Sequence, residues 1–190
     1  MLIGIAGPSC SGKSTVASQV AHALSGTLLH LDGRWVSGAL KPVVSGHRSY
    51  ERPHQYDGAS LLRDALEALG RNPPVVIEGF LLFCYPGIAE ACTHRFFLGV
   101  PHRELVARRR TRATAGGDAA WGPCGGRNPD ADTAWLAHGR EEWERFGAPQ
   151  ASIPGMHVID ASRPASQATS SVMATIMRQP YFPPVGGPSA

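Results

Sequence analysis

The sequence predicts an α/β fold in which a five-stranded parallel sheet lies between two layers of helices. Short apolar runs of strand length alternate with segments whose apolar residues recur every three or four positions, which is the pattern of strands joined by crossover helices. In addition, a glycine-rich turn directly follows the first apolar run and directly precedes the first helical segment. Together these features predict a three-layer α/β/α arrangement.

The apolar runs predicted as strands are residues 2–6, 27–31, 74–78, 94–99 and 156–160. Helical spacing of apolar residues is found in three segments, from Val16 to Leu24, from Leu61 to Leu69 and from Val172 to Met177. We expect further helices over residues 101–113 and from about Thr133.

Three segments depart from the alternation. Residues 33–55 are aperiodic and follow the second strand, where a parallel sheet binds ligands. Residues 114–131 are rich in glycine and are predicted to form a mobile lid. Residues 180–190 carry four prolines and two glycines and are predicted to be a flexible tail, which leaves residues 1–179 as one domain.

The composition is that of a globular chain: 43% of its 190 residues are hydrophobic. The net charge of +3 has a local origin, because residues 101–112 contain five arginines and one glutamate while the rest of the chain sums to −1. This distribution argues against a broad nucleic-acid-binding face.

The cysteines and the apolar runs predict the compartment. The four cysteines form no CxxC pair, and no leader or run of about 18 apolar residues is found. We therefore expect a cytoplasmic protein without membrane or nucleic-acid partners, either a monomer or a small homo-oligomer.

The glycine-rich turn, Gly7-Pro8-Ser9-Cys10-Ser11-Gly12-Lys13-Ser14, matches the phosphate-binding P-loop GxxxxGK[ST]. In this motif, backbone N–H groups and the helix N-terminus bind phosphate oxygens, the lysine reaches the β- and γ-phosphates, and the serine hydroxyl is a ligand of Mg²⁺. The predicted ATP-binding residues of the loop are Gly7, Ser9, Cys10, Ser11, Gly12, Lys13, Ser14 and Thr15. The alternative is a glycine-rich turn that only caps a helix. The chain lacks a GxSxG nucleophile elbow, a GxGxxG dinucleotide motif and an Asn-Lys-x-Asp guanine-binding motif.

Two acidic residues end predicted strands at the ligand-binding edge. Asp32 follows the second strand and Glu78 ends the third. Phosphoryl transfer to a hydroxyl needs one carboxylate to deprotonate or orient the nucleophile and another to hold Mg²⁺ or its waters. The alternatives are an Asp-Gly turn for Asp32 and a structural role for Glu78.

Tyr56 and Asp57 precede the second helical segment. Asp57 is a candidate for binding substrate hydroxyls or, alternatively, a helix N-cap. Tyr56 either stacks on a base or covers the core.

Three arginines of the helix predicted over 101–113, Arg108, Arg109 and Arg112, share one face, within an arc of about 100°, and Arg110 points away from it. Guanidinium groups on one face suit a triphosphate. The alternative is a solvated face.

With these residues the sequence resembles the uridine kinase and nicotinamide riboside kinase family of P-loop kinases, and among them nicotinamide riboside kinases most. The resemblance extends from Leu2 to about Asp160 and includes GPSCSGKS, Tyr56-Asp57, the run Ile77-Glu78-Gly79-Phe80-Leu81-Leu82-Phe83 and the arginine helix. It implies ATP- and Mg²⁺-dependent phosphorylation of a nucleoside 5′-hydroxyl.

The resemblance also implies residue roles. Asp32 accepts the hydroxyl proton, Lys13 contacts the phosphates, and Ser14 and Glu78 lie on the magnesium side. Asp57 and Arg109 hold the ribose hydroxyls, Tyr56 stacks on the base, and Arg108 and Arg112 serve ATP and the lid. Two positions depart from the family: Gly33 follows Asp32 where a second acidic or small polar residue is frequent, and Thr114 stands where nicotinamide riboside kinases have a lid tyrosine. Trp121 is a candidate replacement for that tyrosine.

The hypothesis is therefore an ATP-dependent kinase that acts on a nucleoside, with nicotinamide riboside ahead of uridine and cytidine. A kinase of another small hydroxylated metabolite and a non-catalytic ATP-binding sensor are the alternatives.

Overall fold

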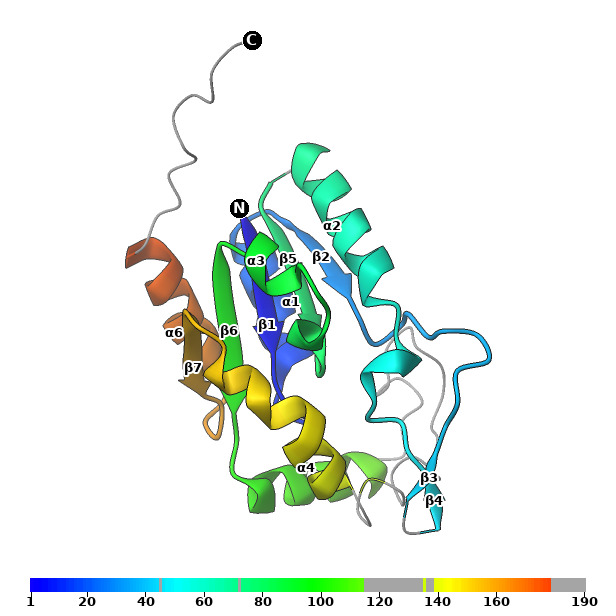
Figure 1. The fold of residues 1–190 in the computed structure, drawn as a ribbon. Helices are drawn as coiled ribbons and strands as arrows, with labels where there is room; N and C mark the ends of the chain where they lie inside the picture. The colour runs from blue at the N-terminus through cyan, green and yellow to red at the C-terminus, as the bar shows by residue number, and fades with distance from the viewer. Residues whose placement is uncertain (45, 72, 115–134, 136–138, 179–190) are drawn as a thin grey trace.

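Five parallel strands in the order β2-β5-β1-β6-β7 form the central sheet (Figure 1). They are β1 (Leu2–Ala6), β2 (Thr27–His30), β5 (Val75–Gly79), β6 (His94–Gly99) and β7 (Met156–Asp160). The structure, a computed structural model, describes the chain except for residues 45, 72, 115–134, 136–138 and 179–190. The predicted fold class is confirmed, with strand boundaries that differ by one residue at most.

Alternate residues of the strands enter two separate cores, because successive side chains of a strand point to opposite faces of the sheet. In β1, Leu2 belongs to one core and Ile3 to the other. In β6, Phe97 and Phe96 are divided in the same way. All five residues of β1 and of β5 are buried, as expected for central strands covered on both faces.

The helices supply the outer layers. On one face, α1 (Lys13–Ala23) and α6 (Ala165–Arg178) pack against the sheet and against each other. On the other face lie α2 (Gly58–Arg71), α3 (Ile88–Ala91), a 3₁₀ turn (Leu82–Cys84), and a π-helical turn (Trp143–Gly147) that runs into a second 3₁₀ turn (Ala148–Ser152). The arginine-rich helix α4 (His102–Thr114) lies beyond the carboxyl ends of the strands (Figure 1).

The segment of residues 33–55, expected to be an aperiodic loop, contains short regular pieces. A hairpin joins β3 (Val43–Val44) to β4 (His47–Arg48), and a 3₁₀ turn follows at Pro53–Gln55. Two-residue strands carry no periodicity that a sequence pattern can reveal. This hairpin lies at the same end of the molecule as α4 (Figure 1).

Of the lid predicted over 114–131, residues 115–131 lie outside the described residues, as does the predicted tail at 180–190. The helix predicted from about Thr133 is described only in part, and its described residues, 135 and 139–142, are helical. The division into one domain over residues 1–179 stays a prediction. Among the described helices, none is both long and apolar enough to cross a membrane.

Candidate active site

The loop between β1 and α1 has backbone conformations that favour glycine. Gly12, directly before α1, has a φ of 88°, in the left-handed region. A Cβ atom on Gly7 would lie 3.0 Å from the carbonyl oxygen of Leu98 in β6. The P-loop sequence therefore occupies the strand-to-helix turn that its chemistry requires, with the first N–H groups of α1 available to an anion.

Lys13 and Asp32 meet at the end of this loop. Lys13 is the first residue of α1, and its Nζ atom lies 3.9 Å from Oδ2 of Asp32, which follows β2. Within the described part of the chain, the other carboxylate oxygen, Oδ1, is buried and has no hydrogen-bond partner, although 37% of the side chain is exposed. Burial raises the pKa of Asp32, and the Lys13 ammonium acts in the opposite direction. Such a carboxylate is suited to receive a proton from a hydroxyl.

Ser14, Glu78 and His30 form a second polar group beside this pair. Ser14 Oγ donates a hydrogen bond of 3.2 Å to Oε1 of Glu78, and Nδ1 of His30 lies 2.6 Å from the same oxygen. The contact with Glu78 raises the pKa of His30. His30 was not predicted as a site residue, although its place near the end of the second predicted strand was a usable signal. In the structure it lies opposite Glu78 in the sheet register.

The donor set of Ser14 and Glu78 fits Mg²⁺. Oε2 of Glu78 is buried without a hydrogen-bond partner among the described residues, and hydroxyl and carboxylate oxygens are the ligands this ion prefers. The described residues contain no cluster of three or more His, Cys, Asp or Glu side chains that could hold a metal by themselves. Mg²⁺ commonly takes its other ligands from phosphates and water.

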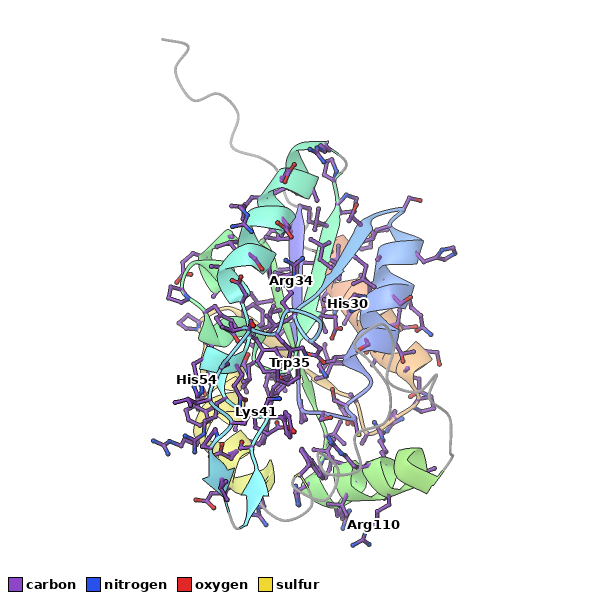
Figure 2. The ribbon with its side chains drawn as sticks, turned by 90° about the vertical axis from the view of Figure 1, so that its right-hand side faces the viewer. His30, Arg34, Trp35, Lys41, His54 and Arg110 are labelled. Carbon is purple, nitrogen blue, oxygen red and sulfur yellow. The ribbon has the colours of Figure 1, made fainter. Side chains whose placement is uncertain are left out.

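The arginines of α4 differ in their surroundings. Arg109 is 4% exposed, donates a 2.8 Å hydrogen bond from Nη1 to Ser9 Oγ of the P-loop, and places its guanidinium 4.9 Å from the centre of the Trp135 ring. Arg110 is exposed and extends away from the molecule (Figure 2). Arg112 belongs to α4, and its side chain lies outside the described part.

Arg108 borders a pocket of about 310 Å³ behind the P-loop. Its Nη2 donates hydrogen bonds to the carbonyl oxygens of Ala161 (2.9 Å) and Ser162 (3.0 Å). The pocket extends from Ser11 and Gly12 to residues 161–165 and is a suitable place for the base of a bound nucleotide. Residues 161–165 were not predicted as site residues, although their position directly after the last predicted strand, at the carboxyl edge of the sheet, was a signal.

The contacts of Tyr56 and Asp57 favour the structural roles that were their alternatives, a cover of the core for Tyr56 and a helix N-cap for Asp57. Tyr56 is 6% exposed and packs between Trp35 (4.4 Å between ring centres) and Phe80 (5.1 Å). Asp57 is exposed, and its Oδ1 accepts a 2.9 Å hydrogen bond from the N–H of Ser60, which caps α2. The Tyr56 ring covers the core here, and the second carboxylate oxygen of Asp57 remains available to a ligand.

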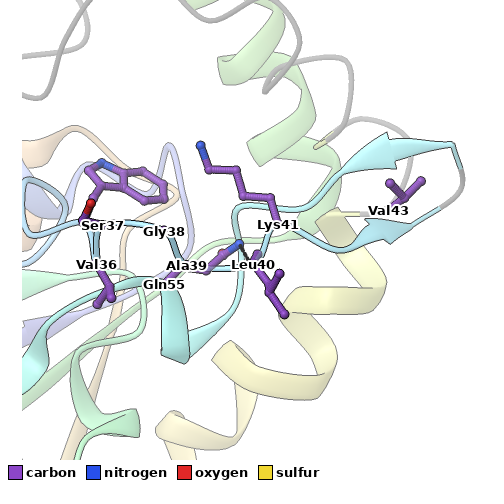
Figure 3. A pocket seen from close by; sticks show the side chains of 9 residues that line it. Val36, Ser37, Gly38, Ala39, Leu40, Lys41, Val43 and Gln55 are labelled. Atoms are coloured by element: carbon purple, nitrogen blue, oxygen red, sulfur yellow. Dashed lines mark hydrogen bonds between the residues drawn. The ribbon is translucent and has the colours of Figure 1, made fainter.

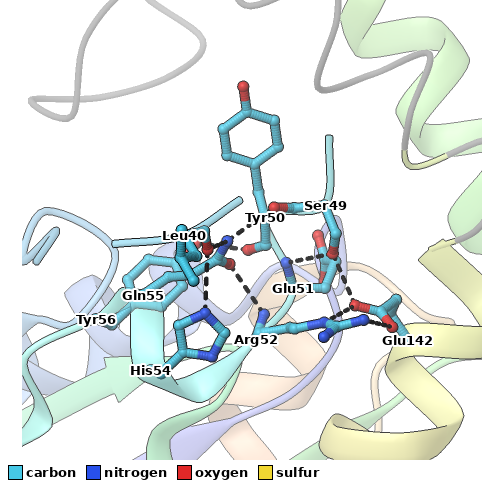
Figure 4. Close-up of polar contacts among 9 residues, drawn as sticks. All are labelled: Leu40, Ser49, Tyr50, Glu51, Arg52, His54, Gln55, Tyr56 and Glu142. Atoms are coloured by element: carbon cyan, nitrogen blue, oxygen red, sulfur yellow. Dashed lines mark hydrogen bonds and ion pairs between the residues drawn. The ribbon is translucent and has the colours of Figure 1, made fainter. Parts of the chain in front are cut away.

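A buried polar cluster that the sequence did not reveal joins the segment before α2 to the helical residues before Trp143 (Figure 4). Glu142, 3% exposed, accepts hydrogen bonds from Ser49 Oγ (2.8 Å) and from Nε (2.8 Å) and Nη2 (3.2 Å) of Arg52. Gln55, fully buried, donates to the carbonyl oxygens of Ser49 and Leu40. These contacts hold together residues that are about 90 positions apart in the sequence, a separation at which no local pattern can predict pairing.

Glu51 lies within this cluster and faces the charges of the site. Burial raises its pKa to about 7, while Arg109 and Lys13 act to lower it and Asp32 and Glu142 to raise it. Its backbone N–H donates to Ser49 Oγ at 3.3 Å. Glu51 is therefore an acidic residue near the P-loop lysine that was not among the predicted site residues.

Of the remaining predicted site residues, Cys10 contributes its carbonyl oxygen to Arg108 at 3.4 Å, and Ser11 is 2% exposed with a hydroxyl that has no partner among the described residues. Thr15 is exposed on α1. Trp121 lies outside the described residues.

No protein-family model matches the chain. Nicotinamide riboside kinase 2 of Mus musculus is 26% identical over 136 residues, which cover 59% of this chain and 68% of the mouse protein. The resemblance to nicotinamide riboside kinases is thus supported beyond the motifs.

Solved structures show the fold. A gluconokinase from Sinorhizobium meliloti 1021 superposes with a TM-score of 0.58 at 16% identity, covering 93% of this chain and 91% of that one. A shikimate kinase from Bacteroides thetaiotaomicron superposes with a TM-score of 0.57 at 17% identity, covering 93% and 98%. The chain therefore has the same α/β fold as these two kinases.

Proposed function

We propose that this protein is an ATP-dependent kinase that transfers the γ-phosphoryl group of ATP to a hydroxyl group of a small molecule. The observation that carries the proposal is the meeting of Lys13 with Asp32, at 3.9 Å, at the end of a P-loop. This contact brings a phosphate-binding cation next to a carboxylate that can receive a proton, as phosphoryl transfer to a hydroxyl requires. A protein that only bound ATP would not need this carboxylate.

The P-loop residues bind the donor. The N–H groups at the start of α1 and the Lys13 ammonium hold the β- and γ-phosphates, and the pocket beside Arg108 receives the base. Arg109, fixed by Ser9, supplies positive charge where the transferred group develops negative charge.

In the transfer step, the acceptor hydroxyl oxygen forms a bond to the γ-phosphorus as the bond to the β-phosphate oxygen breaks and ADP leaves. Asp32 accepts the hydroxyl proton, and its raised pKa favours this role. Ser14 and Glu78 would hold Mg²⁺, which when bound neutralises phosphate charge and orients the leaving oxygens.

We infer that the acceptor is a nucleoside phosphorylated at its 5′-hydroxyl, with nicotinamide riboside first and uridine or cytidine next. The 26% identity to a nicotinamide riboside kinase supports this order. So does the IEGFLLF run that begins at Ile77. The groups that would contact the ribose hydroxyls are Arg109, the second carboxylate oxygen of Asp57, and Glu51.

One observation favours a second acceptor class. Tyr56 is covered by its neighbours, and one Asp57 oxygen is occupied by the α2 cap. A smaller polyhydroxy acceptor would need neither residue. The two structural relatives are named as kinases of gluconate and shikimate. These two compounds are therefore included as acceptors in the test.

The test is a coupled assay of ADP release from Mg-ATP with a panel of nucleosides, gluconate and shikimate. We expect ADP formation that depends on one acceptor and is lost in Lys13→Ala, while Arg103→Met, which removes an exposed cation of α4, retains it. ADP release that no acceptor stimulates, or ATP binding without transfer to any compound of the panel, would contradict the proposal.

A further inference from the structure

The segment that follows Asp32 folds around a pocket of its own, of about 620 Å³ (Figure 3). Its walls come from residues 35–41, Val43 and Gln55. Hydrogen bonds tie the segment to the residues before α2: Val36 N–H donates to the Gln55 carbonyl at 2.9 Å, and Asp57 N–H donates to the Arg34 carbonyl at 2.8 Å. The pocket is therefore a constructed feature of the 33–57 region and distinct from the pocket beside Arg108.

An indole ring forms one side of this pocket. The Trp35 ring packs on Tyr56 at 4.4 Å and meets Tyr50 edge to face at 5.9 Å. These two tyrosines fix the ring, yet 42% of Trp35 remains exposed. A fixed, half-exposed indole is a suitable surface for a planar ring.

A lysine without a counter-charge lies over the same aromatic rings. The Nζ atom of Lys41 is 5.8 Å from the centre of the Trp35 ring and 5.0 Å from that of Tyr50. Within the described residues, Lys41 forms no ion pair with a carboxylate. Figure 3 shows its side chain extending on the opposite side of the loop from Val36 and Leu40. The charge of Lys41 is thus available to an anionic ligand in the pocket.

The pocket lies within reach of the transfer site. Trp35 is three residues from Asp32, a length of chain that spans at most about 11 Å. This is comparable with the reach of a nucleoside from its 5′-oxygen to the far edge of its base. A riboside with its hydroxyl at Asp32 can therefore place its base in the Trp35 pocket.

We propose that Trp35 and Lys41 form the base-binding part of the acceptor site, and that they select ribosides whose base carries a carboxylate. Trp35 contacts the ring and Lys41 pairs with the carboxylate. This inference rests on the proposed kinase function and adds the chemistry of the acceptor. Trp35, rather than the covered Tyr56, then supplies the ring contact.

Two matched pairs of acceptors test the carboxylate contact. Nicotinic acid riboside has a carboxylate where nicotinamide riboside has a carboxamide. Orotidine has a carboxylate where uridine has a hydrogen atom. In the wild-type protein the Lys41 ammonium and the carboxylate form a charge-assisted hydrogen bond. We therefore expect kcat/KM for the carboxylate member of at least one pair to be about tenfold higher, which corresponds to about 1.4 kcal/mol. Lys41→Met abolishes this ratio and Lys41→Arg retains most of it. Trp35→Leu raises KM for both members.

Arg103→Met is the matched control, because it removes one exposed positive charge from α4 without touching the pocket. It should keep the tenfold ratio. Raising the salt concentration should reduce the ratio in the wild type and leave Lys41→Met unaffected, since exposed charges are screened.

Calorimetric titration of the same four ribosides into the wild type and Lys41→Met separates this inference from the kinase function. If the carboxylate member binds more tightly to the wild type and this preference disappears in Lys41→Met, the inference is supported, even where no ADP forms. The lack of ADP formation would then overturn the kinase proposal alone. Equal binding and equal kcat/KM within both pairs, unchanged by Lys41→Met, overturns the inference while the kinase proposal stands.

Discussion

The two sides of the candidate active site are built in different ways. The donor side, from the P-loop to Asp32 and Glu78, consists of residues at the ends of β1, β2 and β5 and at the start of α1. The acceptor side, residues 33–57, consists of a short hairpin, a 3₁₀ turn and a buried cluster of polar side chains. The sheet thus fixes the groups that we propose bind phosphate, and side-chain hydrogen bonds fix the region that we propose selects the acceptor.

The largest effect is expected on the donor side, from Lys13→Arg. In the proposed mechanism the buried Lys13 side chain, 7% exposed, reaches the phosphates as a point charge, and a planar guanidinium is too broad for the same place. We expect kcat/KM to fall by about 10³-fold with little change in melting temperature, measured by ADP release and by thermal unfolding. Activity within tenfold of the wild type would show that charge alone matters there.

On the acceptor side, the removal of a positive charge from the buried polar cluster should affect stability. Arg52→Met leaves the Glu142 carboxylate buried with one partner fewer, so we expect a loss of about 3 kcal/mol in the free energy of unfolding. Glu142→Gln, which leaves Arg52 with partial access to water, should cost about 1–2 kcal/mol.

The exposed pair of Arg140 and Glu144 is the matched control for this cluster. Its side chains are 68% and 60% exposed, so Arg140→Met should change the free energy of unfolding by no more than about 0.5 kcal/mol. Urea denaturation measures all three variants. Equal losses from Arg52→Met and Arg140→Met would mean that the buried cluster does not hold the acceptor side together.

Glu51 gives the acceptor side a pH dependence. Burial raises its pKa to about 7, from an ordinary value of 4.5, so between these pH values the folded protein keeps a proton that the unfolded chain has lost. Stability therefore falls as pH rises from about 4.5 to 7, by at most about 1.4 kcal/mol per pH unit from this group, and levels off above. Glu51→Gln should flatten this slope, whereas Glu141→Gln, on an exposed residue, should leave it unchanged. A slope that persists in Glu51→Gln would assign it to other groups.

The smallest effect is expected at Asp57, where two variants separate its cap from its proposed substrate contact. Asp57→Ala should lower the free energy of unfolding by about 1 kcal/mol, and Asp57→Asn, which can still cap α2, by much less. If the free oxygen binds ribose hydroxyls, both variants raise KM for the acceptor. An acceptor KM that neither variant changes would assign Asp57 to the cap alone and favour a smaller acceptor.

The contrast between the two sides also explains what the sequence could predict. The strands were predictable because each is a continuous apolar run, and the P-loop because its glycines stand between a strand and a helix. The approach of Asp32 to Lys13 followed from the rule that parallel strands end at one edge. Glu142 was not predictable, because its partners Ser49 and Arg52 are about 90 residues away.

Two residues of the acceptor side could not be assigned from the sequence for a different reason. Tyr56 had two equally reasonable uses, and the choice depended on Trp35, which packs against it from a segment without periodicity. Glu51 gave no signal at all, because its significance comes from the charges of Arg109 and Lys13 that the fold brings near it. Sequence patterns predict contacts made by regular elements, whereas these contacts arise from irregular segments.

In the proposed mechanism, the P-loop binds the phosphates of ATP and Asp32 takes the proton of the acceptor hydroxyl. The most direct measurement is single-turnover formation of the phosphorylated acceptor, followed by mass spectrometry, in the wild type and in Asp32→Asn, together with ATP affinity by calorimetry. We predict that Asp32→Asn binds ATP with an affinity close to that of the wild type and forms product at least 10²-fold more slowly. Product formation by Asp32→Asn within a few-fold of the wild-type rate would contradict the account.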